Sequence, residues 1–268
     1  SADYSDFRPQ INALSYALNG TLVYNNPESI EDTLWYNPSL NSAGIEYSEV
    51  EIKNEFREYG FYILRNKDIK IIIRCGSHKH RPSQADNLHM DVWKGSENVL
   101  IDGGTYKYNT TEEELNFFMG TGSHNTVILA DENQMQRGGR FIWYNWTHCK
   151  SAELSESKEQ ITFTGEISCF DHLGKAIIHK RTVVLRDSDN AILVSDSIQN
   201  LPENVLVTQN WHRNINAGME VIFQTSDCEE SKIETSSYSR YYGVKKESEI
   251  IKLSTSKSTI NTEIHINI

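Results

Sequence analysis

The chain has 268 residues, 38% of them hydrophobic, and a formal net charge of −11. This length suffices to bury a large core, either in one large β domain or in two smaller domains. The negative charge excludes nucleic acid as a main partner, because phosphate binding depends on clustered Lys and Arg, and no apolar run is long enough to predict a membrane span.

Residues 1–44 are predicted to form a helical segment or linker. Apolar residues at Ile11, Leu14 and Leu18, followed by Gly20, indicate one amphipathic helix. A second short helix is expected just before Pro38. A pair of helices leaves an apolar face uncovered, so this segment either docks on the following domain or is the tail of a missing helical domain.

From residue 45 to residue 268 the hydrophobic pattern has a period of two, which is typical of strands. Because short strands separated by turns predominate, the fold class is predicted to be mainly β, a large antiparallel sandwich preceded by a short helical N-terminal segment. Residues 226–242 are polar and serine-rich and are predicted to be a loop or a marginal strand. The expected strands cover residues 59–65, 69–74, 89–93, 125–129, 161–164, 177–185, 191–195, 205–211, 220–223, 250–253 and 259–266.

Polar side chains concentrate at the ends of two of these strands and of the apolar run at residues 99–101. Asp102 follows an apolar run and precedes two glycines, where it either caps the turn or serves a functional site. His124 stands at the start of a strand, and His89 shares one strand face with Asp91. Two histidines and an aspartate from separate strand ends offer the ligand types of a zinc site.

Tyr106 and Tyr108 alternate after the turn and are expected to share one face. A tyrosine donates a proton or, beside a cation, acts as a base. The alternative is that both are ordinary strand residues with hydrated hydroxyl groups.

The four cysteines, Cys75, Cys149, Cys169 and Cys228, show no Cys-x-x-Cys spacing. They permit disulfides in an oxidising compartment but do not require them. Cys75 and Cys169 end apolar alternations, where buried free thiols are common.

Several motifs follow one another along the chain, at residues 56–65, 80–89, 100–108, 123–127 and 131–135. Their order resembles the C-terminal β-sandwich of the heparinase II/III-like polysaccharide lyases. The resemblance is strong between residues 56 and 146, and beyond that it fades to a strand pattern that includes His179 to Arg181 and Tyr241 to Gly243. It implies a helical toroid packed on the sandwich, and an acidic polysaccharide cleaved beside a uronic acid by β-elimination.

The resemblance also implies a metal held by a His, an Asp before a Gly and a His before Asn-Thr. Asp102 and His124 match the last two ligands, and the first falls on Gln84, where the family has a His. The metal residues are therefore expected to be Gln84, Asp102 and His124, with zinc or another divalent cation. Expected catalytic residues are His80, His89, Tyr106 and Tyr108, and expected substrate-binding residues are Arg81, Gln84, Asp86 and Asn125.

Three functions remain open at this point. The first is the C-terminal domain of a lyase for uronic-acid-containing polysaccharide, associated with bacterial surface-polysaccharide metabolism, in a periplasmic or secreted location with a cytoplasmic one as the alternative. The second is a non-catalytic carbohydrate-binding or assembly module. The third is a glycoside hydrolase that uses Asp86 and Asp91 as paired carboxylates.

Overall fold

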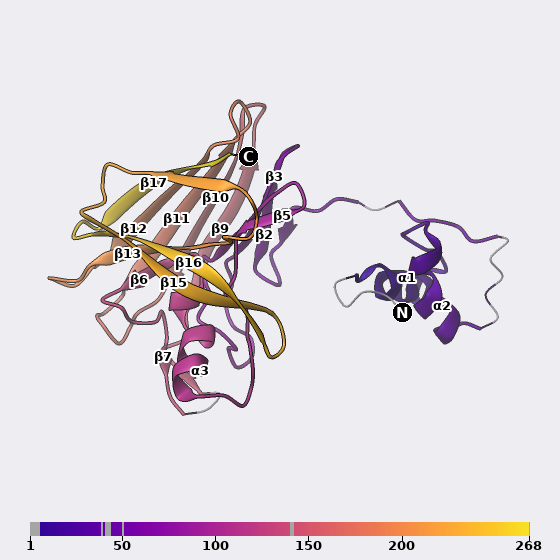
Figure 1. Ribbon diagram of the computed structural model, residues 1–268, viewed down its shortest axis with the longest axis horizontal. Helices are drawn as coiled ribbons and strands as arrows, with labels where there is room; N and C mark the ends of the chain where they lie inside the picture. The colour runs from indigo at the N-terminus through magenta and orange to yellow at the C-terminus, as the bar shows by residue number, and fades with distance from the viewer. Residues whose placement is uncertain (1–5, 39, 41–43, 50, 140–141, 268) are drawn as a thin grey trace. The chain divides into compact units, whose positions relative to one another are not determined.

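The computed structural model describes residues 6–38, 40, 44–49, 51–139 and 142–267. The chain divides into two compact units, Ser1–Lys53 and Asn54–Ile268 (Figure 1). Among the described helices, none combines the length and the hydropathy needed to cross a membrane.

The first unit is helical, as the sequence predicts. It contains α1 (Arg8–Asn19), a 3₁₀ turn (Pro27–Ser29) and α2 (Glu31–Tyr36). Helix α1 ends at Gly20, whose φ of 73° is the left-handed conformation that glycine adopts without strain. The buried Asn12 connects α1 to the turn, because its amide donates to the carbonyls of Tyr24 and Ser29, both at 3.0 Å.

The second unit contains two antiparallel sheets. Within the described residues the larger sheet has nine strands in the order β1-β2-β3-β4-β5-β13-β16-β15, with β6 also paired to β13, and the smaller has six in the order β14-β17-β12-β11-β10-β9. Strands β7 (Gln136–Arg137) and β8 (Trp143–Tyr144) form a separate hairpin. The larger sheet comprises β1 (Glu55–Phe56), β2 (Phe61–Arg65), β3 (Ile69–Arg74), β4 (Met90–Lys94), β5 (Glu97–Leu100), β6 (Val127–Leu129), β13 (Val207–Arg213), β15 (Glu230–Tyr241) and β16 (Val244–Thr255). The smaller sheet comprises β9 (His148–Glu156), β10 (Gln160–Ser168), β11 (Ile178–Arg186), β12 (Ile192–Gln199), β14 (Glu220–Gln224) and β17 (Thr259–Asn267).

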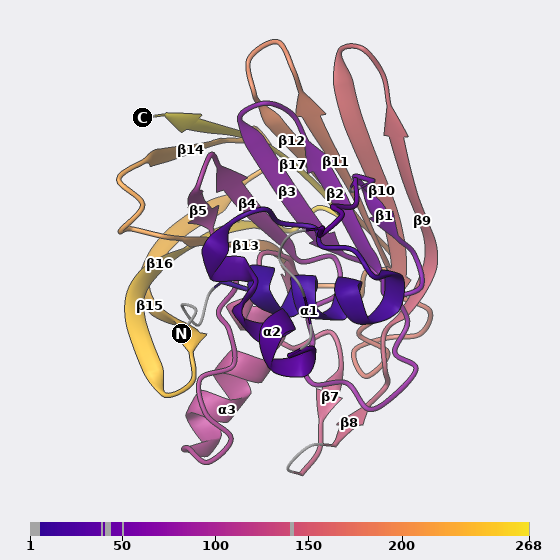
Figure 2. The same ribbon diagram turned by 90° about the vertical axis from the view of Figure 1, so that its right-hand side faces the viewer.

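The two sheets face each other across one hydrophobic core (Figures 1 and 2). Alternation produces this arrangement, since Val183 and Leu185 of β11 are buried while the residues between and beside them are partly exposed. Across the core, the rings of Tyr62 and Phe163 lie 5.0 Å apart and join β2 to β10. Burial of a side chain as large as Phe163 stabilises the fold by about 1.5–3 kcal/mol. The predicted antiparallel β-sandwich is therefore confirmed.

Several elements depart from the sequence prediction, among them strand β9, whose residues are mostly exposed and which was not expected. Helix α3 (Glu112–Met119) was not expected, although Thr111 provides its N-cap by accepting a hydrogen bond from the amide of Glu114 at 3.3 Å. Residues 230–241, predicted to be a loop or a marginal strand, form the long strand β15 at the outer edge of the nine-stranded sheet. An edge strand with mostly exposed residues lacks the alternating pattern that marks a half-buried strand. The polar sequence of β15 therefore did not identify it clearly as a strand.

Candidate metal centre and adjoining pocket

Three side chains that are distant in the sequence meet at one end of the nine-stranded sheet. His89, Asp102 and His124 each offer one ligand atom, and these atoms all lie within 4.8 Å of one another. Asp102 is the central member, since its Oδ2 atom lies 2.9 Å from Nδ1 of His124 and 3.4 Å from Nε2 of His89. We call these three residues the His-Asp-His cluster.

Strand pairing brings the cluster together. His89 directly precedes β4, and Asp102 follows β5 with one residue between them. Because β4 and β5 are antiparallel neighbours, these positions lie side by side at the same end of the two strands. His124 belongs to the segment before β6, and this segment is attached to β4 by a hydrogen bond of 3.3 Å from the amide of Met90 to the carbonyl of Asn125.

The two glycines after Asp102 permit a close approach of backbone segments. A Cβ atom on Gly103 would lie 2.7 Å from the Cβ of Ser123, and one on Gly104 would lie 2.0 Å from the carbonyl oxygen of Ser239. Gly104 also has a φ of 78°, which strains any residue with a side chain. The glycines therefore allow the Asp102 loop to pack between the His124 segment and β15.

The charges of the cluster follow from burial and from the shared carboxylate. Burial alone would raise the pKa of Asp102, but His124, His89 and the amide of Gly104 lower it well below its usual range. Burial opposes a positive charge on His124, but the adjacent carboxylate prevails and raises its pKa. For His89 burial prevails and lowers the pKa to about 3, so this imidazole is neutral near pH 7.

The neutral His89 has a defined proton position. Its Nδ1 atom accepts a hydrogen bond from the amide of Asn125 at 2.9 Å, so its single proton is on Nε2 and faces Asp102. A cation bound at Nε2 would replace this proton, as metal binding to protein ligands commonly does.

The cluster has the composition of a site for a divalent cation. Two imidazole nitrogens and a carboxylate oxygen form the ligand set of many zinc sites. The Nε2 atoms of His89 and His124 are buried and have no hydrogen-bond partner among the described residues. Since a buried polar atom without a partner is costly, the residues fit a bound cation.

Gln84, the expected first metal ligand, has a different environment. Its amide group donates to the carbonyl oxygens of Gly104 at 3.0 Å and Phe118 at 3.1 Å. It therefore supports the loop that carries Asp102, and His89 supplies the third member of the cluster.

Two of the expected substrate-binding residues, Asn125 and Asp86, lie near the cluster. Asn125 is fully buried, and its amide donates to the carbonyls of Met90 and Ile101 while its oxygen accepts the amide hydrogen of His212. All its polar atoms are thus used to position the loops rather than to bind substrate. Asp86 is half-buried, and its charge contributes to the raised pKa of His124.

The other expected residues lie toward the surface. His80, Arg81 and Tyr108 are exposed, and Arg81 and Tyr108 line a pocket of about 330 Å³ together with Gln84. The alternation expected for the two tyrosines is wrong, because residues 105–108 are not a strand and Tyr106 has a φ of 61°. The ring of Tyr106 instead packs on Phe118, with a centroid distance of 5.4 Å.

A fully buried arginine supports the cluster from the opposite sheet. Arg181 of β11 donates through Nη1 to the carbonyls of Leu88 at 2.7 Å and Asn125 at 2.6 Å, which directly precede His89 and follow His124. Its Nε and Nη2 atoms donate to the two oxygens of Asp196 of β12, both at 2.8 Å.

The Asp196 carboxylate is fully satisfied inside the sandwich. It lies 2.7 Å from Nε2 of His179 and also accepts a hydrogen bond of 2.7 Å from Gln209 of β13. Burial would raise the pKa of Asp196, but Arg181 and His179 lower it well below its usual range. We call Arg181, Asp196, His179 and Gln209 the buried polar network.

A pocket of about 360 Å³ opens beside the cluster, and Asp102 lines it. Arg240 of β15 and Lys246 of β16 also line it, together with Tyr238 and Tyr241. Asp91, on the neighbouring β4, accepts hydrogen bonds from the side chains of Trp93 and Asn98, and the latter two residues belong to the pocket wall.

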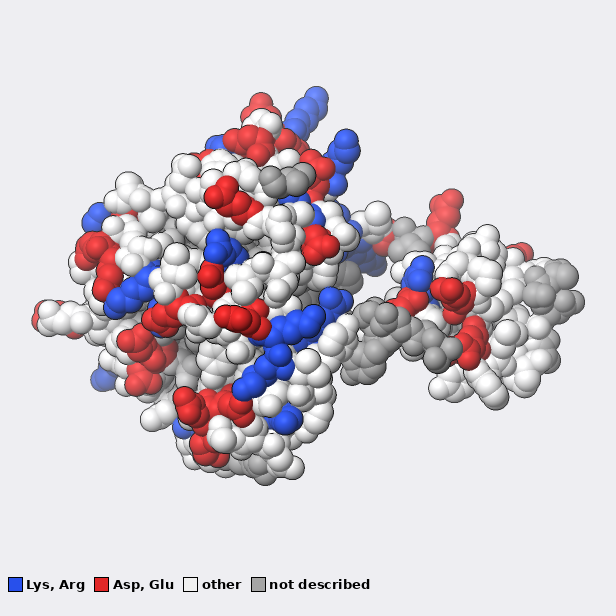
Figure 3. Space-filling model, in the orientation of Figure 1, with Lys and Arg blue, Asp and Glu red and all other residues white. Residues whose placement is uncertain are grey.

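Basic side chains surround the tip of the β15–β16 hairpin. Lys107 and Lys245 each place an ammonium group 4.9 Å from the ring centre of Tyr106. With Arg240 and Lys246 they form what we call the basic rim. Figure 3 shows Lys and Arg side chains gathered beside this hairpin on a face that otherwise carries both charges.

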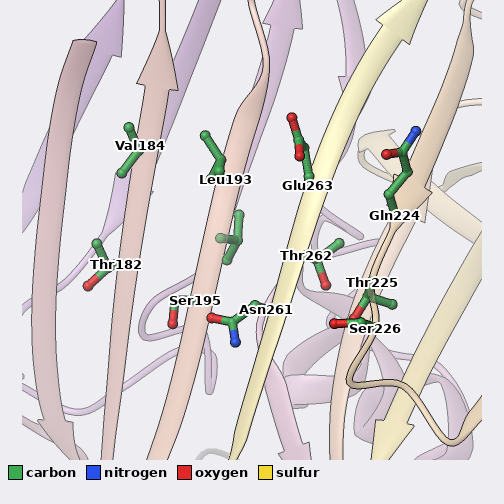
Figure 4. A pocket seen from close by; sticks show the side chains of 11 residues that line it. Thr182, Val184, Leu193, Ser195, Gln224, Thr225, Ser226, Asn261, Thr262 and Glu263 are labelled. Atoms are coloured by element: carbon green, nitrogen blue, oxygen red, sulfur yellow. The ribbon is translucent and has the colours of Figure 1, made fainter.

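A second hollow lies on the other side of the smaller sheet. It has a volume of about 570 Å³ and is lined by Thr182, Leu193, Ser195 and Glu263, whose side chains Figure 4 shows on β11, β12 and β17. Since successive strand residues point to opposite faces, Thr182 faces away from the side to which Arg181 points. This hollow is therefore separate from the cluster.

Sequence reasoning missed His212 and the roles of Arg181 and Asp196. His212 of β13 is buried next to the cluster, where its Nε2 lies 2.8 Å from the carbonyl of Gly122 and burial lowers its pKa to about 4. One signal was present: His179 and Arg181 share the strand face of Val183, and polar residues on a buried face require partners.

Residues 50–266 match the family model described as heparinase II/III-like, C-terminal. The structure resembles heparinase III, the BT4657 gene product with methylated lysines, with a TM-score of 0.71 and 16% identity over 99% of this chain and 41% of that one. It also resembles heparan sulfate lyase HepC from Pedobacter heparinus, with a TM-score of 0.66 and 12% identity over 99% of this chain and 42% of that one. The chain thus spans about two-fifths of the length of each protein. A comparison with curated protein sequences finds no match.

Metal binding tests the cluster directly. After removal of metal and re-equilibration with Zn²⁺, we expect the chain to retain roughly one equivalent through gel filtration, because the three ligands fit a zinc site. The variants Asp102→Asn and His124→Ala should retain little. The matched control is His265→Ala, since this half-buried histidine on β17 lies outside the cluster. Elemental analysis measures the metal, and equal retention by all variants would contradict the assignment.

Loss of Arg181 should destabilise the sandwich. Arg181→Met leaves the buried Asp196 charge uncompensated, and we expect the free energy of unfolding to fall by about 3–5 kcal/mol in urea titrations. The control Arg186→Met removes a partly exposed arginine from the same strand and should cost about 1 kcal/mol or less. The double variant Arg181→Met, Asp196→Leu should recover part of the loss, and a single variant as stable as the wild type would refute the role of this ion pair.

Proposed function

Since the chain belongs to the heparinase II/III-like family, we propose that it is the C-terminal domain of a lyase that cleaves a uronic-acid-containing polysaccharide by β-elimination. The family match over residues 50–266 and the fold support a polysaccharide lyase-related domain. The finer assignment of substrate class and reaction rests on the pocket beside the His-Asp-His cluster.

The observation that carries the proposal is the position of positive charge at this pocket. The chain as a whole is strongly acidic, with a net charge of −11, yet Arg240 and Lys246 both line the pocket that Asp102 also lines. Exposed charges act over about 8 Å at physiological ionic strength. A polyanion would therefore be held locally by the basic rim rather than attracted by the molecule as a whole.

β-Elimination requires three contributions from an active site. The uronate carboxylate must be neutralised, a base must remove the proton on the adjacent carbon, and an acid must protonate the leaving oxygen. We assign neutralisation to Arg240 and Lys246, because a guanidinium binds a carboxylate through two parallel hydrogen bonds and an ammonium adds charge. Tyr241 and Tyr238 line the same pocket and supply phenol groups for proton transfer.

The His-Asp-His cluster would hold a divalent cation, for which zinc is our proposal. His89, Asp102 and His124 would hold the cation, which would supply positive charge beside the pocket that Asp102 lines. The remaining acid–base groups would come from a helical toroid domain of the whole protein, as the resemblance to the lyases implies.

A second candidate function is a non-catalytic carbohydrate-binding module. Burial of the cluster favours it, because His89 is 7% exposed and His124 is 0% exposed. Catalytic metal sites keep one coordination position open to substrate, whereas structural sites are closed. In this module the cation would serve only to hold the loops, and the basic rim would bind an acidic glycan without cleaving it.

One pair of measurements separates the two functions. Isothermal titration of the chain with uronate oligosaccharides should show binding, and the whole protein incubated with the same sugars should release an unsaturated product that absorbs at roughly 235 nm, as elimination requires. Binding by the whole protein without this product would support the module and refute the lyase. Absence of binding to every uronate polymer would refute both.

The basic rim can be tested by a single substitution. Arg240→Ala removes a charge-assisted hydrogen bond, so we expect the affinity for uronate oligosaccharides to fall roughly 10-fold to 100-fold. The control Lys158→Ala removes an exposed charge from the turn between β9 and β10 and should leave the affinity within about twofold, because screened surface charges contribute little. Equal losses in both variants would show that only overall charge matters.

A further inference from the structure

Two of the four cysteines lie in contact across the sandwich. Cys75 directly follows β3 of the larger sheet and is buried, and Cys149 belongs to β9 of the smaller sheet and is half-buried. Their Sγ atoms are 3.7 Å apart. The separation of 74 residues in the sequence gives no sign of this contact.

We propose that Cys75 and Cys149 form a disulfide that joins the two sheets when the chain meets a disulfide oxidant such as glutathione disulfide. The pair is distinct from the His-Asp-His cluster and from the basic rim. The inference therefore does not depend on the proposed lyase function.

The backbone around both cysteines is already held in place. The amide of Cys149 donates to Oγ of Ser77 at 3.0 Å. The side-chain amide of Asn87 donates to the carbonyl of Gly76 at 3.0 Å and to Oγ1 of Thr147 at 2.6 Å. These bonds fix the segments next to both thiols, and bond formation brings the two sulfur atoms from 3.7 Å to about 2.0 Å apart.

The surroundings make Cys149 the more reactive thiol. The hydrogen bond with Cys75 lowers the pKa of Cys149, and the positive charge of Arg74 adds to this effect. The same hydrogen bond, together with burial, raises the pKa of Cys75. Because the thiolate is the nucleophile and Cys149 is the less buried of the two, Cys149 attacks first.

The exchange balances in two steps. The Cys149 thiolate attacks one sulfur of glutathione disulfide, forms a mixed disulfide and releases one glutathione thiolate. Cys75 then loses its proton and attacks the Cys149 sulfur, which forms the protein disulfide and releases the second glutathione. The chain loses two electrons and two protons in total, and glutathione disulfide is reduced to two molecules of glutathione.

The cross-link would close a covalent loop that contains the three residues of the candidate metal centre. Residues 75–149 contain His89, Asp102 and His124, so all members of the cluster lie within the closed loop. Strand β9 is also the edge of the smaller sheet, where only β10 pairs with it among the described strands (Figure 2). A disulfide here would restrict the unfolded chain and secure this edge strand.

The experiment uses the purified chain, reduced, freed of reductant and then exposed to glutathione disulfide. Titration of thiols under denaturing conditions should fall from four per chain to two, and peptide mapping without reductant should recover a Cys75–Cys149 cross-linked peptide. The midpoint of thermal unfolding should rise by on the order of 5–10 °C, and dithiothreitol should reverse the rise.

Two matched variants identify the pair. Cys149→Ser should keep its remaining thiols and show no rise in the unfolding midpoint, whereas Cys228→Ser, which replaces another half-buried cysteine, should still form the cross-link. The proposal is overturned if the wild type keeps all its thiols, if only a glutathione adduct forms, or if the cross-linked peptide contains Cys169 or Cys228.

Discussion

The ion pair between Arg181 and Asp196 is the interaction on which the site depends. It is buried between the sheets, and the guanidinium uses its donors in two directions, toward the carboxylate of β12 and toward the backbone carbonyls of Leu88 and Asn125. Those carbonyls belong to the neighbours of His89 and His124 in the sequence. An ammonium group lacks the planar arrangement of donors needed to bind a carboxylate and two carbonyls at once, which explains why arginine occupies the position.

In this arrangement, the residues that hold the cluster in place differ from the residues proposed to bind a ligand. The imidazoles of the cluster are buried and held by the polar interior, while the basic rim lies around the β15–β16 hairpin, and Lys107 joins it from the loop after Asp102. Asp102 connects the two regions, since it is the member of the cluster that also lines the pocket. A bound polyanion and a bound cation would thus both lie beside the loop that carries Asp102, and Gly103 and Gly104 allow that loop to pack between the His124 segment and β15.

The contact between Cys75 and Cys149 adjoins the same framework, since Cys75 directly follows Arg74, whose amide donates to the carbonyl of His89 at 3.0 Å. Asn87 connects the two regions, because its side chain contacts the segments beside both cysteines and its backbone lies two residues before His89. The segment from Gly76 to His89 is therefore held at one end by the thiol pair and at the other by Arg181. This explains how a long connection between β3 and β4 keeps a histidine in a fixed position.

The sequence by itself determined most of the fold and part of the site. Alternation identified the half-buried strands, including β11 with its polar positions 179 and 181, and the motifs around Asp102 and His124 indicated the family. It left His89 and Gln84 as alternative third members beside Asp102 and His124, and it left residues 226–242 as a loop or a marginal strand. Those features depend on which strand ends become neighbours, and only the tertiary structure decides this, because hydrogen bonding between strands acts across long separations that local periodicity does not record.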